Sequence, residues 1–140
     1  MKKLLLLAAL ASTATLGLTG CDTAIGVNNK DDSTAQYNLG AFTTRYTAKS
    51  PEYIENVFMA SKKALDQLGY FRTGETPGKD AVTIFARAHG DVQITIDIFK
   101  KVIEAKDGSK SEWIYVAIRY GTWGNAKECQ QIVSKISENL

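Results

Sequence analysis

Few side chains in this sequence could support catalysis: there are two cysteines, Cys21 and Cys129, and one histidine, His89. A Ser-His-Asp or Cys-His arrangement would have to use His89, which falls in a predicted hairpin turn. Cys129 falls on the apolar side of a predicted helix, where a thiol behaves as a small buried hydrophobic group. One histidine and one buried cysteine give no recognisable spacing of metal ligands. We therefore expect no enzyme, no metal and no cofactor.

The glycine-rich segment 73–79 is a second candidate, because it is weakly similar to a phosphate-binding P-loop. Gly74 and Gly78 are one residue too close together for that motif. Asp80 also stands where a serine or threonine would hold magnesium. We therefore expect an ordinary loop here and no bound nucleotide.

The first twenty residues have the composition of a secretion signal. Lys2 and Lys3 precede an apolar run that extends to about residue 16, too short for a bilayer core of roughly 30 Å. Leu18-Thr19-Gly20-Cys21 follows and resembles the lipobox of bacterial lipoproteins. The resemblance implies diacylglycerol transfer to the Cys21 thiol and cleavage between Gly20 and Cys21. An ordinary signal peptide with a chance cysteine is the alternative.

Lipidation would place the mature chain on the extracytoplasmic side of the cell membrane. Each buried CH₂ contributes about 0.8 kcal/mol, so two or three acyl chains such as palmitate hold far more firmly than one. Asp22 resembles the signal that retains Gram-negative lipoproteins in the inner membrane, which favours its periplasmic face over the outer membrane. Alternatively, Asp22 merely begins a polar tether. Residues 22–35 are small, polar and aperiodic, and they predict a flexible tether of about 20 Å.

Length and charge limit what the mature chain can be. Residues 1–20 form the predicted signal, residues 21–35 the lipidated cysteine and tether, and residues 36–140 a single domain. The full chain has a formal charge of +2, and removal of Lys2 and Lys3 brings the mature side chains to about zero. This charge gives no reason to expect nucleic acid as a partner.

Alternating apolar side chains predict strands around residues 82–86, 92–98 and 114–118. Valine, isoleucine or alanine occupies every second position, so the three apolar faces form one wall of a core. Turns are expected at Ala88-His89-Gly90, which would place Arg87 opposite Asp91, and at Asp107-Gly108. A further strand is expected over residues 36–46, with one face carrying Tyr37, Leu39, Ala41 and Thr43.

Two amphipathic helices complete the predicted fold. Ser50 is expected to cap the first, with Pro51 in its first position and Gly69 at its end. Its apolar stripe comprises Ile54, Val57, Phe58, Ala64, Leu65 and Leu68. Asn125 is expected to cap the second, whose apolar side comprises Ala126, Cys129, Ile132, Val133, Ile136 and Leu140. A short apolar stretch, Tyr70 and Phe71, follows the first helix. The order β-α-β-β-β-β-α predicts an α+β domain, with both helices packed on one face of a mostly antiparallel sheet.

A family resemblance covers nearly the whole mature chain. It rests on the lipobox, the strand 36–46, the helix 50–69 and the run 116–125, which reads Val-Ala-Ile-Arg-Tyr-Gly-Thr-Trp-Gly-Asn. These features look like those of a family of small bacterial lipoproteins catalogued only as a domain of unknown function. The resemblance implies the same fold and a lipoprotein, and it carries no catalytic residues.

The face of the sheet turned away from the helices is the remaining candidate site. Aromatic and basic side chains are expected on it, chiefly Phe85, Arg87, Phe99, Trp113, Tyr115 and Arg119. Exposed apolar patches mark partner surfaces, and Trp, Tyr and Arg are enriched at binding hot spots. We expect a non-enzymatic binding or assembly module of the cell envelope, whose partner is a protein, peptidoglycan or lipid. Alternatively, the first strand or the tether covers this face, the face forms a homodimer, or the chain is an accessory subunit or an enzyme with an unrecognised site.

Overall fold

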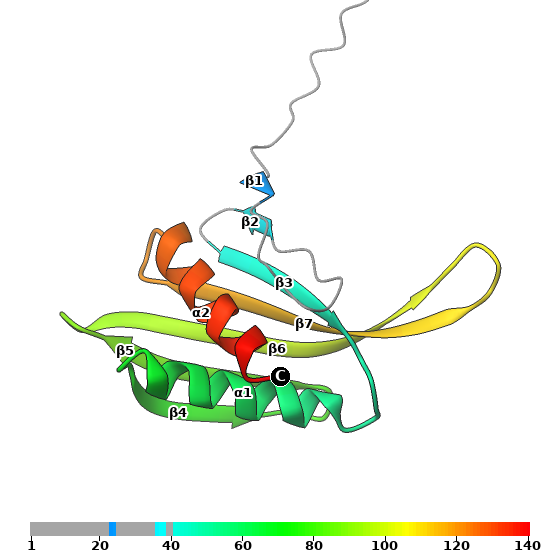
Figure 1. Cartoon of the computed structure of the whole chain (residues 1–140), viewed down its shortest axis with the longest axis horizontal. Helices are drawn as coiled ribbons and strands as arrows, with labels where there is room; N and C mark the ends of the chain where they lie inside the picture. The colour runs from blue at the N-terminus through cyan, green and yellow to red at the C-terminus, as the bar shows by residue number, and fades with distance from the viewer. Residues whose placement is uncertain (1–22, 25–35, 39–40) are drawn as a thin grey trace, which may run out of the picture.

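The computed structural model describes residues 23–24, 36–38 and 41–140; the predicted signal, Gly20 and Cys21 lie outside them. The described residues form a seven-stranded antiparallel sheet of order β1-β2-β3-β7-β6-β5-β4, with two helices on one side (Figure 1). The elements are β1 (Thr23–Ala24), β2 (Gln36–Asn38), β3 (Ala41–Thr47), α1 (Tyr53–Gln67), β4 (Phe71–Pro77), β5 (Ala81–Ala88), β6 (Val92–Glu104), β7 (Lys110–Tyr120) and α2 (Ala126–Glu138). From β3 to α2 the order is the predicted β-α-β-β-β-β-α, and the fold is α+β.

The predicted strand 36–46 is wrong as a single element. It consists of β2 and β3, which pair with each other so that Gln36 lies opposite Thr43. Asparagine and glycine favour turns, and here Asn38 ends β2 and Gly40 immediately precedes β3 in the sequence. The side chains that β3 buries are Phe42, Thr44 and Tyr46, not those of Ala41 and Thr43. Part of the predicted tether is also strand, because β1 pairs with β2; residues 25–35 lie outside the described residues.

The inner face of the sheet, covered by the helices, forms the core. Its eight central side chains are at most 1 % exposed: Ile84, Ala86, Ile94, Ile96, Ile98, Ile114, Val116 and Ile118. The register aligns Ile84, Ile96 and Ile118 in one row across three strands. Fully buried helix residues pack against them: Val57, Ala64, Leu65, Cys129, Ile132, Val133 and Ile136. The predicted facing of the three strands is confirmed.

The structure confirms two of the three predicted helix ends. α1 begins at Tyr53 after Glu52, with no side-chain cap, so the predicted Ser50 cap is wrong, and Pro51 lies in the turn before the helix rather than in its first position. The Ser50 carbonyl instead accepts a hydrogen bond from the Tyr53 amide in the preceding turn. Gly69 ends α1 with a φ of 74°, and the Gly69 and Tyr70 amides donate to the carbonyls of the last turn. Asn125 caps α2 by accepting from the Glu128 amide at 3.2 Å.

The turn between β5 and β6 differs from prediction by one residue. Ala88 pairs with Val92, so the three loop residues are His89, Gly90 and Asp91, and Arg87 lies opposite Gln93 rather than Asp91. The predicted turn and the observed turn both have three loop residues, so each side chain of β5 and β6 stays on its predicted face of the sheet.

The predicted turn between β6 and β7 is confirmed. Gly108 has a φ of 82°, and the Asp107 carboxylate accepts hydrogen bonds from the Ser109 hydroxyl and amide. These bonds lower the pKa of Asp107.

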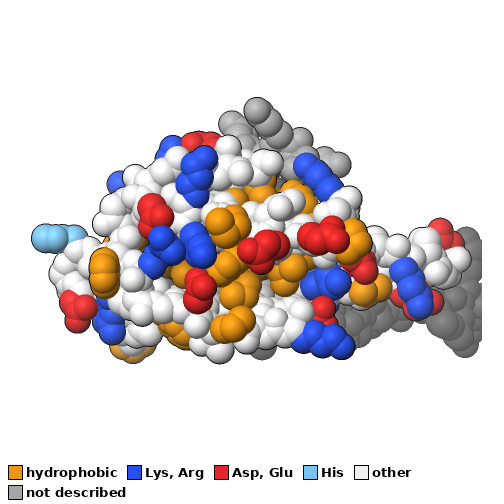
Figure 2. Space-filling model, turned by 90° about the horizontal axis from the view of Figure 1, so that it is seen from below, with side chains coloured by type: hydrophobic (Ala, Val, Ile, Leu, Met, Phe, Trp, Pro, Cys, Tyr) orange, Lys and Arg blue, Asp and Glu red, His pale blue; other side chains and the backbone are white. Residues whose placement is uncertain are grey.

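The predicted loop 73–79 is mostly the edge strand β4, all of whose residues are exposed. Edge strands protected by charge resist pairing with other chains, and here Arg72 contacts Asp66 at 2.8 Å and Lys62 contacts Glu75 at 3.6 Å. In the view of Figure 2, from below relative to Figure 1, basic and acidic side chains alternate around hydrophobic ones. The segment leads into another strand, unlike a P-loop, which opens a helix.

Candidate binding surface

The outer face of the sheet, opposite both helices, carries all six predicted face residues. Phe85 and Arg87 come from β5, Phe99 from β6, and Trp113, Tyr115 and Arg119 from β7. The register separates them into two groups along the strands. Between the groups runs a row of smaller side chains, in which Thr43, Ala117, Asp97 and Thr83 are successive neighbours. The face is therefore not one continuous aromatic patch.

The first group is an aromatic cluster made of Arg45, Phe99, Lys101, Trp113 and Tyr115. The Phe99 and Tyr115 rings are stacked, with centroids 5.4 Å apart and planes 8° apart. The Arg45 guanidinium lies 4.6 Å from the centre of the Trp113 ring, and the Lys101 ammonium lies 5.6 Å from that of Tyr115. The Trp113 indole donates a hydrogen bond to the Ser111 hydroxyl at 2.9 Å. These contacts fix the ring orientations and leave the three rings and Arg45 half-buried, whereas Lys101 is exposed.

Arg45 is the member of this cluster that the sequence analysis missed. It lies opposite Tyr115 in the register and next to Trp113, because β3 pairs directly with β7. Its Nε is buried and has no hydrogen-bond partner among the described residues, so the contact with the Trp113 ring is what holds the guanidinium in place. Arg45 alternates along β3 with the buried Phe42, Thr44 and Tyr46, and this pattern would have placed Arg45 on the outer face. Treating residues 36–46 as one strand hides this pattern.

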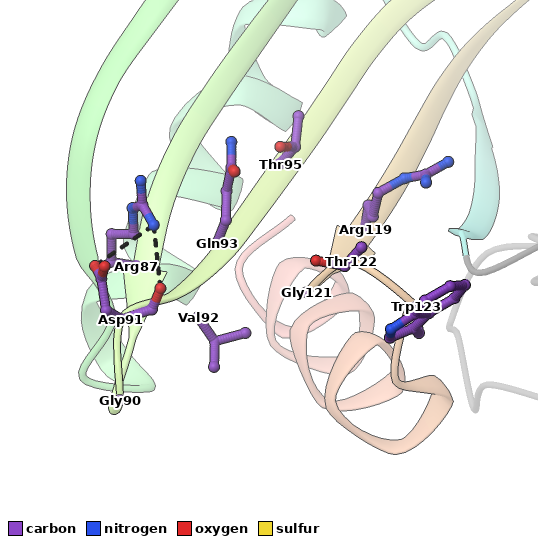
Figure 3. A pocket seen from close by; sticks show the side chains of 10 residues that line it. All are labelled: Arg87, Gly90, Asp91, Val92, Gln93, Thr95, Arg119, Gly121, Thr122 and Trp123. Carbon is purple, nitrogen blue, oxygen red and sulfur yellow. Dashed lines mark hydrogen bonds and ion pairs between the residues drawn. The ribbon is translucent and has the colours of Figure 1, made fainter.

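The second group lies at the opposite end of the strands, around an open hollow of about 650 Å³ that we call the arginine hollow (Figure 3). It lies between the β5–β6 turn and the loop before α2. Its lining comprises Arg87, Gly90, Asp91, Val92, Gln93, Thr95, Arg119, Gly121, Thr122 and Trp123. The Gly121 amide donates to the Gln93 carbonyl at 2.7 Å, which ties the loop to the sheet.

The two arginines of the hollow differ in their electrostatic environment. Arg87 donates to the Asp91 carbonyl at 3.1 Å, and its guanidinium lies 3.4 Å from the Asp91 carboxylate. Arg119 is exposed and has no ion pair within the part of the chain that the structure describes. Trp123, which the sequence analysis did not select, is 90 % exposed beside it. A solvent-facing tryptophan next to an unpaired arginine is a surface to which a ligand could bind.

Titratable groups elsewhere favour packing over catalysis. Tyr70 donates a hydrogen bond to the Glu128 carboxylate at 2.9 Å, and burial together with this bond raises the pKa of Tyr70. Burial also raises the pKa of the Cys129 thiol, which contacts the Ile118 carbonyl at 3.6 Å. The predicted core position of Cys129 is confirmed, and a thiol with a raised pKa is a poor nucleophile.

The chain's one histidine, His89, lies in a turn as predicted. His89 is exposed there, between β5 and β6. In the described ranges no three or more His, Cys, Asp or Glu side chains gather where they could hold a metal ion. Nor is any helix there long and apolar enough to cross a bilayer.

Comparison with known proteins gives a family without an assigned activity. No curated protein matches the sequence. A family model described as a protein of unknown function, DUF3568, matches residues 3–139, nearly the whole chain. The chain therefore belongs to the DUF3568 family.

Proposed function

We propose that this chain is a lipoprotein of the bacterial cell envelope, anchored through lipid on Cys21. The support is the order of sequence features: a basic start, a short apolar run and Leu18-Thr19-Gly20-Cys21. The anchor would hold the domain on the extracytoplasmic side of the membrane, and Asp22 favours the inner membrane of a Gram-negative cell.

The Cys21 thiol is the acceptor in this proposal, so Cys21→Ser should leave an unlipidated, uncleaved precursor. Metabolic labelling of cells with a clickable palmitate analogue measures the lipid, and the gel mobility of the same chain measures cleavage. Cys129→Ala is the matched control, because it removes the other cysteine and should leave labelling intact. Equal labelling of wild type and Cys21→Ser would disprove the lipid anchor.

We infer that the domain itself is a non-enzymatic binding module whose contact surface is the aromatic cluster. The observation that carries this inference is the stacked pair of Phe99 and Tyr115, with Arg45 over Trp113, on the side of the sheet opposite both helices. Rings held in one orientation lose little entropy on binding, and Trp, Tyr and Arg are the usual hot-spot residues. The same surface also offers cations, which suits a partner that is both apolar and acidic.

A protein of the envelope is the partner that this surface fits best. A photo-crosslinking amino acid in place of Tyr115, in the full-length chain in intact cells, should give one discrete adduct. The same amino acid in place of Phe71 is the control, because Phe71 is 73 % exposed on the distant edge strand β4. Adducts of equal yield at both positions would contradict the proposal, and an adduct with a second copy of this chain would replace the envelope partner with a homodimer.

A further inference from the structure

The sheet begins very close to the proposed lipid anchor. β1 starts at Thr23, only two residues after Cys21. Two residues of chain reach at most about 7 Å, even when fully extended. Thr23 pairs with Tyr37 of β2, so Cys21 is at most about 7 Å along the chain from a residue of the sheet. A lipid on Cys21 would therefore hold the β1 edge of the sheet next to the bilayer, without the long tether that composition predicted.

The register shows which end of the strands the anchor would approach. Ala24 aligns through Gln36 and Thr43 with Ala117 of β7. Thr23 aligns through Tyr37 and Phe42 with Ile118, so the first residue of β1 lies toward the Arg119 end of the strands. β7 is three strands from β1, a lateral distance of about 14 Å. The arginine hollow therefore lies at the anchored end of the domain.

The side chains at this end suit the surface of a bilayer. Trp123 is 90 % exposed, and tryptophan concentrates where acyl chains meet headgroups. Arg119 lies beside it without an ion pair in the described chain, and arginine binds lipid phosphate through paired hydrogen bonds. Arg87 has its charge partly neutralised by Asp91. Basic residues near a membrane surface also gain from the negative potential of anionic lipids.

We propose, on the basis of the lipid anchor at Cys21, that the arginine hollow rests on anionic phospholipid headgroups, with Trp123 in the interfacial layer and Arg119 bound to lipid phosphate. This orientation sends the aromatic cluster away from the membrane. Trp113 lies six residues from Arg119 along β7, about 20 Å in an extended strand. The cluster is then free to meet a partner while the hollow contacts lipid.

The emission of the two tryptophans reports how close each end of the outer face lies to the bilayer. The lipidated full chain is reconstituted into vesicles of phosphatidylethanolamine and phosphatidylglycerol, with lipids brominated near the headgroup end of the acyl chains. Bromine quenches tryptophan emission on contact. The Trp113→Phe chain leaves Trp123 as its one tryptophan, and its emission should fall roughly twofold, as for a ring at headgroup depth. The matched Trp123→Phe chain leaves Trp113, whose emission should be unchanged.

Substitution of the two arginines tests whether they hold Trp123 at the bilayer surface. In the Trp113→Phe background, Arg119→Gln should restore most of the lost emission, and Arg87→Gln should restore less because Arg87 is already paired. Vesicles of phosphatidylcholine in place of phosphatidylglycerol should also reduce the quenching, because they lack net negative charge.

The possible failures are distinguishable by flotation of the vesicles. A chain that floats with the vesicles while Trp123 stays unquenched, or while Trp113 is quenched as strongly, overturns the proposed orientation and leaves the lipid anchor standing. If the chain purified from cells carries no lipid and does not float with the vesicles, the lipid anchor is overturned, and the proposed orientation with it.

Discussion

The two faces of the same strands carry different side chains and differ in how deeply these side chains are buried. The inner face consists of aliphatic residues such as Ile96 and Ile118, which are completely buried under the helices. The outer face carries Phe99, Trp113 and Tyr115, which contact one another or basic side chains and stay half-buried. Substitutions on the inner face should therefore affect folding, and those on the outer face should affect binding.

The largest expected effect is on the inner face. Ile96 lies in the central row of the core and is fully buried, so Ile96→Ala should lower the free energy of unfolding by about 2–5 kcal/mol. Thr95 is its neighbour on the outer face, and Thr95→Ala should cost less than about 1 kcal/mol. Chemical denaturation of both variants measures the difference. Similar losses for the two would mean that the outer face is as buried as the inner one.

A smaller effect is expected at Cys129, also on the inner side. Cys129→Ala should lower the free energy of unfolding by roughly 1 kcal/mol. In the Cys21→Ser chain Cys129 is the one remaining thiol, and it should resist thiol reagents until the domain unfolds. Rapid modification of the native chain would show that the α2 face is wrongly assigned.

The pH dependence of stability follows from the raised pKa of Cys129. The unfolded thiol ionises near pH 8.5, before the folded one does. The folded state then holds more protons, so its stability is complete below about pH 8.5 and falls as the pH rises further. Cys129→Ala should remove the first part of this alkaline loss. Tyr70 and Tyr120, whose pKa values burial also raises, should continue it at higher pH.

The smallest effect is expected at Arg45 on the outer face. Arg45→Gln removes the guanidinium from the Trp113 ring, and a cation–π contact that stays partly in water contributes about 0.5–1 kcal/mol. The emission of Trp113, recorded in the Trp123→Phe chain, should change at the same time. A loss of stability as large as that of Ile96→Ala would indicate that Arg45 belongs to the core.

Sequence reasoning succeeded where burial alternates along a strand. The isoleucines of β6 and β7 fixed the two faces, and with them the side on which Phe99, Trp113 and Tyr115 lie. It failed for most of β4, where it found only the apolar stretch Tyr70-Phe71 and predicted a loop, because all residues of that strand are exposed and leave no alternation to detect. It also failed at β1 and β2, which are two and three residues long and too short for a periodic pattern.

The division of the outer face could not be predicted for a different reason. Side-chain parity assigns a face, but only the pairing register places residues of different strands in the same row. Phe99 meets Tyr115 because their strands align there, and Arg119 aligns instead with Thr95. Trp123 comes from a loop, so no strand pattern could place it at the hollow.

We propose that the outer aromatic cluster binds a partner and does not hold the fold together. Trp113→Ala tests it most directly when unfolding and cellular crosslinking through Tyr115 are measured on the same full-length chain. We expect binding to weaken by about 2 kcal/mol or more, seen as loss of the adduct, with the free energy of unfolding nearly unchanged. An unfolding loss of roughly 3–5 kcal/mol, the cost of truncating a large core aromatic, would contradict the claim.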